Sequence, residues 1–190
     1  MSSDEAHLEE WAWLARAADG DDASFHLLVE RYQGRLLNYF LRAGAKEHAE
    51  DLVQETFIRL YRHRSRAKPL ARFTTYAHTL AHHVWIDHLR KHGRALRTQE
   101  AVRAHTDTED QRSSRTAPAR LDAERLLDAL SPDLRDTVVL VVYQGLTHPE
   151  AAEALGIPEG TVKSRIFHAM QRMRALLDEQ PHARPHEPHG

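Results

Sequence analysis

The spacing of apolar residues constrains the fold of this chain more than any other feature. In successive segments these residues recur at steps of three and four, which is the period of one face of an α-helix. Aromatic residues make up only 7% of the chain, with eight Gly and eight Pro, which gives little support to a strand-rich sandwich. The sequence therefore predicts an all-α fold. The first stripe, between residues 22 and 41, consists of Phe25, Leu28, Val29, Tyr32, Leu36, Leu37 and Phe40.

Two more helices are predicted after Gly44, which interrupts the first stripe. One covers residues 47–63, and the other covers residues 73–90 after a loop marked by Pro69. Ahead of all three, residues 1–21 are acidic, and Trp11 and Trp13 are expected either to pack in a helix or to meet a regulatory protein. The two stripes consist of Ala49, Leu52, Val53, Phe57 and Leu60, and of Tyr76, Ala77, Leu80, Ala81 and Val84.

The apolar period disappears between residues 93 and 119, where the sequence is polar and rich in Ser, Thr and mixed charge. Such composition is typical of a flexible connector, and 190 residues are enough for two small domains. We therefore expect two small helical domains joined by a flexible linker. The expected organisation is an acidic segment at 1–21, a first domain at 22–92, a linker at 93–119, a second domain at 120–178 and a His- and Pro-rich tail at 179–190.

The second domain has the signals of a helix-turn-helix. Ser131 followed by Pro132 is typical of a helix start, and Thr147 with Glu150 has the spacing of a capping box. A short helix then ends at Gly156, and another is predicted from residue 158 or 159 to about 177. A plain helical hairpin with a Gly turn shares this pattern. DNA binding is favoured over that alternative because the last helix carries exposed polar residues suited to bases and phosphates. They are Glu159, Thr161, Lys163, Ser164, Arg165, His168 and, one turn further on, Arg172.

Composition excludes several classes of protein. The chain has no Cys, so disulfides, thiolate zinc sites and a catalytic Cys are excluded. The sequence lacks both a secretory signal and about 18 consecutive apolar residues, so a cytoplasmic protein without membrane insertion is expected. The net charge of −2 argues against coating DNA by bulk electrostatics. No nucleophile, phosphate loop or carboxylate dyad is recognisable, so we expect no enzyme and no cofactor.

Four blocks, in order along the chain, resemble the extracytoplasmic-function (ECF) sigma factors of the sigma-70 family. Each block is common by itself, and the resemblance depends on their order around a linker. The first three resemble the sigma-two domain, and the fourth resembles the sigma-four domain. They are DDASF at 21–25 with Arg31 and Tyr32, AEDLVQETF at 49–57, IDHLR at 86–90, and finally LSP at 130–132 with GLT at 145–147, AAEALGI at 151–157 and GTVKSR at 160–165.

The resemblance implies a division of labour among three surfaces. The helix at 47–63 would bind RNA polymerase core at the clamp helices of its largest subunit, and the flap of the core is a further expected contact of the chain. The helix at 73–90 would read the minus-ten element as melted single strand, and the last helix would read the minus-thirty-five element as duplex. An anti-sigma factor is expected as a further partner. The implied core-binding residues are Asp51, Leu52, Gln54, Glu55 and Ile58; the implied minus-ten residues are His78, His82, His83, Asp87, Arg90 and Lys91; the minus-thirty-five residues are the seven of the last helix given above.

The chain departs from the family in the minus-ten helix. His83 stands where the family usually has Asn, and His82 stands where it usually has Arg. An imidazole can stack on a base and form hydrogen bonds, yet it neutralises phosphate weakly at neutral pH. Trp85 is bulkier than the usual residue, and His168 replaces a frequent Arg. These differences put the base specificity of the minus-ten helix in doubt.

Two His pairs have the four-residue spacing of metal ligands on a helix. They are His78 with His82 and His88 with His92. We expect no metal site from them, because no Cys is available, no Glu follows His78 in the metalloprotease pattern, and exposed His residues suit a DNA-facing helix. The tail is expected to be disordered and at most a weak metal binder. Two other functions stay open: a repressor or activator that acts without polymerase, and a metal-dependent hydrolase.

Overall fold

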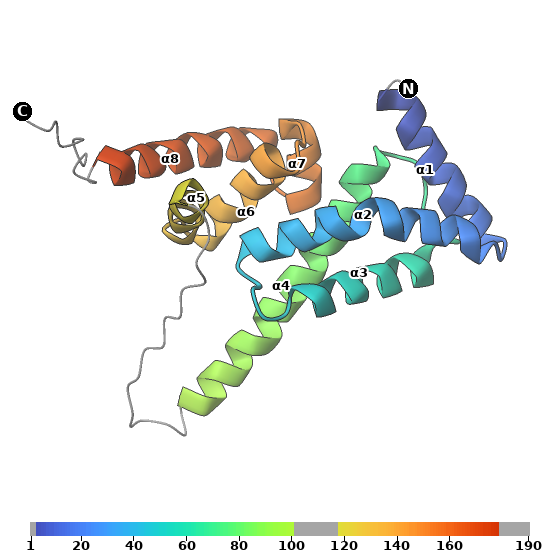
Figure 1. Cartoon of the computed structure of the whole chain (residues 1–190), viewed down its shortest axis with the longest axis horizontal. Coiled ribbons are helices and arrows are strands. Elements are labelled where there is room, and N and C mark those ends of the chain that lie inside the picture. The colour runs from blue at the N-terminus through green and yellow to red at the C-terminus, as the bar shows by residue number, and fades with distance from the viewer. Residues whose placement is uncertain (1–2, 101–117, 179–190) are drawn as a thin grey trace, which may run out of the picture.

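The computed structural model describes residues 3–100 and 118–178, and all of its regular elements in those ranges are helical (Figure 1). The all-α prediction is therefore confirmed. Residues 101–117 of the expected linker and the tail from residue 179 lie outside the described residues. The helices are α1 (Ser3–Ala18), α2 (Asp22–Ala43), α3 (Ala49–His63), α4 (Phe73–Glu100), α5 (Pro118–Asp128), α6 (Pro132–Val138), the π-helical turn η1 (Val139–Tyr143), α7 (His148–Leu155) and α8 (Glu159–Asp178).

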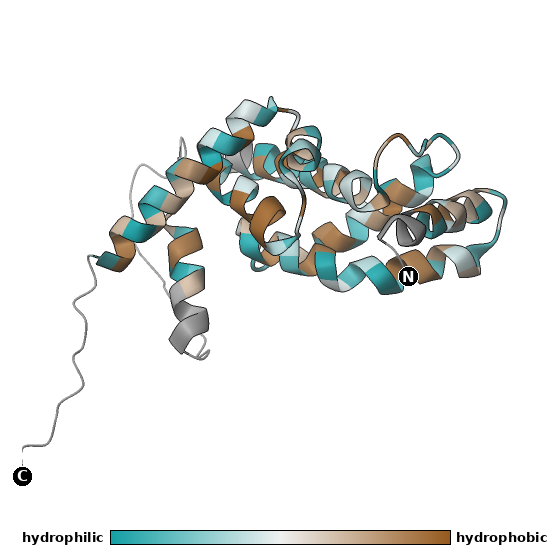
Figure 2. Ribbon diagram, turned by 90° about the horizontal axis from the view of Figure 1, so that it is seen from above, coloured by the Kyte–Doolittle hydropathy of each residue, from teal (hydrophilic) through white to brown (hydrophobic). Residues whose placement is uncertain are grey.

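Helices α1 to α4 form the first domain. The indoles of Trp11 and Trp13 are buried, and Trp11 packs edge-on against Phe73 at the start of α4, with 5.2 Å between ring centroids. The acidic N-terminal segment thus contains a helix that packs against α2 and α4. The apolar stripe predicted for α3 is buried as expected. Along each helix hydrophobic stretches alternate with hydrophilic ones (Figure 2), as amphipathic helices require.

Helix α4 continues to Glu100, ten residues beyond the expected end at Arg90. The sequence predicts a linker from Gly93, but a single glycine lowers helix stability by only about 1 kcal/mol and does not end a helix by itself. The other boundaries lie within a few residues of the prediction. None of the described helices is both long enough and apolar enough to cross a membrane.

Helices α5 to α8 form the second domain, and α7 and α8 are the two helices of the helix-turn-helix. The predicted capping box is present: the Glu150 backbone N–H donates to Thr147 Oγ1 at 3.4 Å, and the Thr147 N–H donates to Glu150 Oε2 at 2.8 Å. Gly156 ends α7 with a φ of 65°, where a side chain would be strained. Val162 of α8 is completely buried in the core.

The second domain packs directly against the first. Helix α7 lies on α4, while α6 and η1 lie on α2, so α6 and α7 stand between α8 and the first domain (Figure 1). The apolar patterns of the two domains do not predict this contact. It decides which of the candidate site residues are accessible.

Candidate functional site

The outer face of α3 presents polar and apolar side chains together. Asp51, Gln54 and Ile58 are exposed, and Ile58 keeps 44% of its surface accessible, which is high for a large apolar residue. Leu52 was expected on this face, but it is only 6% exposed and packs in the core. Leu52 is buried because it belongs to the apolar stripe of α3, and a helical residue on the buried face cannot also face a partner.

Glu55, the fifth expected member of this face, is held by an ion-pair chain that joins α3 to α4. The Arg59 guanidinium donates to Glu55 Oε1 at 2.7 Å and to Asp87 Oδ2 at 2.8 Å. The hydrogen bond from Arg59 lowers the pKa of Asp87. Asp87, expected to contact the minus-ten strand, is therefore engaged in fixing the two helices to each other.

The histidines expected on the minus-ten surface of α4 have different surroundings. His83, Arg90 and Lys91 are exposed, whereas His78 is completely buried and His82 is 9% exposed. His78 Nδ1 donates to the Thr74 carbonyl at 2.8 Å. Burial lowers the pKa of both buried imidazoles to about 4, so they are neutral at physiological pH. In this arrangement His78 and His82 are inaccessible to a DNA strand, contrary to the expectation from sequence.

Polar groups of the second domain cover these two histidines. Gln144 directly follows η1, and its side-chain Oε1 lies 3.3 Å from His78 Nε2. The Gln144 Nε2 donates to Asn38 Oδ1 at 3.2 Å. Asp136 Oδ2 of α6 lies 3.8 Å from His82 Nδ1. Burial raises the pKa of Asp136 to about 7, so this contact is closer to a neutral imidazole facing a carboxylic acid than to an ion pair.

Peripheral contacts surround this buried polar group. Lys46 Nζ lies 3.2 Å from Asp128 Oδ2, and the Arg42 guanidinium lies 3.9 Å from the centre of the Tyr143 ring. Helical periodicity within each segment does not predict this interface. A signal was present, because the polar residue Asp136 lies two positions before the apolar run VVLVVY and Gln144 directly follows it.

Helix α8 exposes the polar face that the sequence predicted. Of the seven expected residues, Glu159, Lys163, Ser164, His168 and Arg172 are exposed, while Thr161 and Arg165 are partly buried. Lys163 pairs with Glu159 at 2.7 Å, and Arg165 Nη2 donates to Asp133 Oδ2 of α6 at 2.8 Å. Arg165 is thus tied to its own domain. Phe167, beside His168, is a further exposed residue of α8 that the polar pattern does not reveal, with 59% of its surface accessible.

These features define a helix-turn-helix protein with a second helical domain and an exposed recognition helix. Family models support this assignment and extend it to both domains. Sigma-70 region 2 matches residues 28–95, and Sigma-70, region 4 matches residues 120–173.

Two relatives are similar over most of this chain. The ECF RNA polymerase sigma factor SigE of Mycolicibacterium smegmatis is 32% identical over 168 residues, which cover 84% of this chain and 65% of that relative. The ECF RNA polymerase sigma factor SigF of Caulobacter vibrioides is 32% identical over 177 residues, which cover 91% of this chain and 95% of that one. The chain belongs to the ECF sigma factors of the sigma-70 family, a class of bacterial transcription initiation factors.

Solved structures share this fold. The sigma factor RpoE of Bartonella quintana, solved with the anti-sigma factor NepR, aligns with a TM-score of 0.68 at 22% identity and covers 83% of this chain and 98% of that one. CnrH, solved with the cytosolic domain of CnrY, aligns with a TM-score of 0.68 at 25% identity and covers 91% of this chain and 99% of that one.

Proposed function

We propose that this chain binds RNA polymerase core through the outer face of α3 and directs promoter-specific initiation. The observation that carries this proposal is the exposure of Asp51, Gln54 and Ile58 on a helix whose opposite face is fully used by the domain core. An exposed apolar side chain among polar ones suits the centre of a protein interface. The order of the two sigma regions along the chain supports the same function.

The two DNA elements are read by different helices in this proposal. Helix α8 enters the major groove of the minus-thirty-five element with Lys163, Ser164 and His168, which are exposed while the domains are packed together. Helix α4 holds the melted minus-ten strand, and His83 is the accessible residue at the position usually filled by Asn. Stacking of an unpaired base on an aromatic ring contributes about 1–3 kcal/mol, which favours the melted strand.

Full use of α4 requires the two domains to separate. The buried faces of His78 and His82 lie under Gln144 and Asp136, so the packed arrangement is a resting state in this proposal. CnrH, whose structure this chain resembles, was solved with the cytosolic domain of CnrY. We extend this to a partner protein, an anti-sigma factor, that controls when the chain reaches polymerase.

Run-off transcription from a set of bacterial promoters tests the function directly. Purified core polymerase with this chain is expected to give promoter-specific transcripts that core polymerase alone does not give. The competing function is a repressor or activator that binds duplex DNA without polymerase. Tight, sequence-specific DNA binding by the chain alone at physiological salt, with no transcript from the reconstituted enzyme, would favour that alternative.

A further inference from the structure

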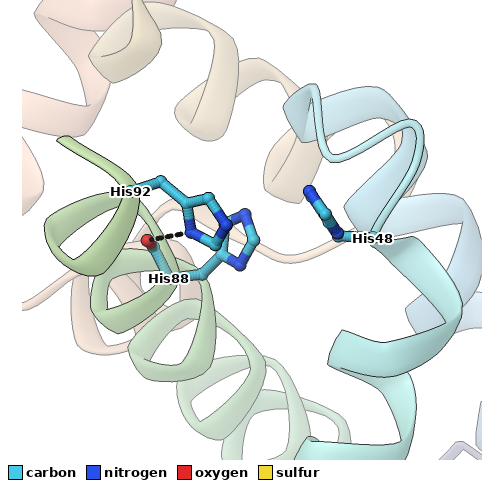
Figure 3. A group of neighbouring side chains, drawn as sticks. All are labelled: His48, His88 and His92. Atoms are coloured by element: carbon cyan, nitrogen blue, oxygen red, sulfur yellow. Dashed lines mark hydrogen bonds between the residues drawn. The ribbon is translucent and has the colours of Figure 1, made fainter. Parts of the chain in front are cut away.

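Three histidines from two segments meet on one side of the first domain. His48 directly precedes α3, while His88 and His92 lie four residues apart on α4 and therefore on the same helical face. Their side chains project into a common space between α4 and the start of α3 (Figure 3). One ring nitrogen from each residue lies within 4.8 Å of the other two. The sequence predicts no metal site from the pair on α4 alone, and the structure adds a third imidazole to it.

The hydrogen bond of His92 leaves a ligand atom available. Its Nδ1 lies 3.1 Å from the His88 carbonyl oxygen, and since a carbonyl only accepts, Nδ1 is the donor (Figure 3). In a neutral imidazole this leaves the lone pair on Nε2. Metal-binding histidines commonly donate their second ring nitrogen to a backbone carbonyl in this way, which fixes both the tautomer and the ring orientation.

The other two rings are also placed to act as ligands. His88 stacks on Trp85, with 5.6 Å between ring centroids and 14° between ring planes, and this contact orients its imidazole. His48 stands at the N-cap position of α3, but its side chain makes no capping hydrogen bond there. Its imidazole is therefore not used to satisfy the helix amides.

We propose that His48, His88 and His92 bind one divalent transition-metal ion, with Zn²⁺ as the ion that three neutral imidazoles suit best. Zinc accepts three histidines at about 2.0–2.1 Å and leaves a fourth position for water, which places the nitrogens about 3.4 Å apart in a tetrahedron. The three ligand nitrogens, which now lie up to 4.8 Å from one another, then have to approach by about 1.4 Å. A movement of His48, which directly precedes α3, supplies such a closure and leaves the hydrogen bond of His92 in place.

The site is independent of the proposed initiation function and adds a property to the first domain. The ion joins the loop before α3 to α4, two segments forty residues apart in the sequence. An ion that binds the folded form alone stabilises it by mass action. Zinc is therefore expected to raise the thermal stability of the first domain.

The test is a zinc titration of the full chain, without an affinity tag, by calorimetry and by thermal unfolding. His182, His186 and His189 of the tail are changed to Ala in every protein so that they do not compete for the ion. In this background we compare the parent with His48→Ala, His88→Ala and His92→Ala. The matched control is His63→Ala, an exposed histidine at the other end of α3.

The parent and the His63→Ala control are expected to bind one zinc per chain and to unfold at higher temperature when zinc is added. Each ligand variant is expected to lose about tenfold or more in affinity. Co²⁺ in place of zinc should give the visible absorption of a tetrahedral complex in the parent, and this band should be absent from the His92→Ala variant.

Equal zinc affinity in the parent and in the His48→Ala and His92→Ala variants would overturn the proposal, as would failure of the parent to bind. Since His88 stacks on Trp85, His88→Ala can also weaken the fold. Thermal unfolding without metal detects this effect. The zinc affinity of the His92→Ala variant, which removes an exposed side chain, then decides whether the three histidines bind the ion.

Discussion

Replacing Asp136 with Asn perturbs the contact between the two domains with little change of shape. Asp136 is 5% exposed and faces His82 of the first domain. Burial raises the pKa of its carboxyl group to about 7, and the neighbouring Asp133 acts in the same direction. The ionised carboxylate is therefore an unfavourable group in the packed arrangement, and Asn removes the charge while keeping the side-chain volume.

The magnitude follows from the difference between the folded and unfolded pKa values. An ordinary Asp has a pKa of 3.8, so the shift to about 7 spans roughly three units. At about 1.36 kcal/mol per unit this corresponds to at most about 4 kcal/mol of unfolding free energy. Because the folded carboxyl binds its proton more tightly, this stability is present below pH 3.8 and is lost as pH rises through 7.

Two buried histidines give the opposite dependence at lower pH. The pKa values of His78 and His82 fall from 6.5 to about 4 on burial, so the stability that they contribute is present above pH 6.5 and is lost as pH falls toward 4. At pH 8 both histidines are neutral and Asp136 is ionised in the folded and in the unfolded state, so the cost of the buried carboxylate is fully expressed there. We expect Asp136→Asn to raise the unfolding free energy by about 2–4 kcal/mol at pH 8, with the difference from the parent growing as pH rises from 3.8 to 7.

Urea unfolding at a series of pH values measures the stability. Domain separation is measured by energy transfer between dyes on two introduced cysteines, which are specific because the chain has no Cys of its own. The Asn variant should stay packed as pH rises and should support less transcription, since His82 remains covered. Asp19→Asn, a change in the exposed turn after α1, is the control. An Asn variant that is less stable than the parent at pH 8, or that keeps the parent's pH slope, would refute the reasoning.

Three further predictions concern the candidate surfaces. Asp51→Lys combined with Gln54→Ala should change the free energy of unfolding by less than about 0.5 kcal/mol per substitution and abolish capture by core polymerase. Phe57→Ala should instead lower the free energy of unfolding by about 3–5 kcal/mol, because the Phe57 ring is buried. Normal capture of the Asp51→Lys, Gln54→Ala variant would place the polymerase contact elsewhere. Lys163→Ala should weaken minus-thirty-five binding by the holoenzyme and lower the salt slope by about one, and footprints equal to those of the parent would contradict the role of α8. His83→Ala should reduce permanganate reactivity of minus-ten thymines with unchanged core binding, and parental reactivity would exclude His83 from strand capture.

Much of the architecture was predictable because it depends on local interactions. The stripe of α3, the capping box of Thr147 and Glu150, and the turn at Gly156 each involve residues within a few positions of one another, so periodicity and residue type suffice to find them. The exposed face of α8 followed in the same way. The end of α4 was misplaced because the one local signal there, Gly93, is a weak one.

Accessibility at the candidate site depended on contacts between residues far apart in the sequence. His78 is covered by Gln144, 66 residues away, and His82 faces Asp136 of the other domain. His48 meets His88 and His92 only because α3 packs on α4. Helical period shows which residues share a face of one helix, but it carries no information about which second element covers that face. The helices and their amphipathic faces were therefore determined by the sequence alone, whereas tertiary packing decided which histidines are buried, which are exposed and which lie together.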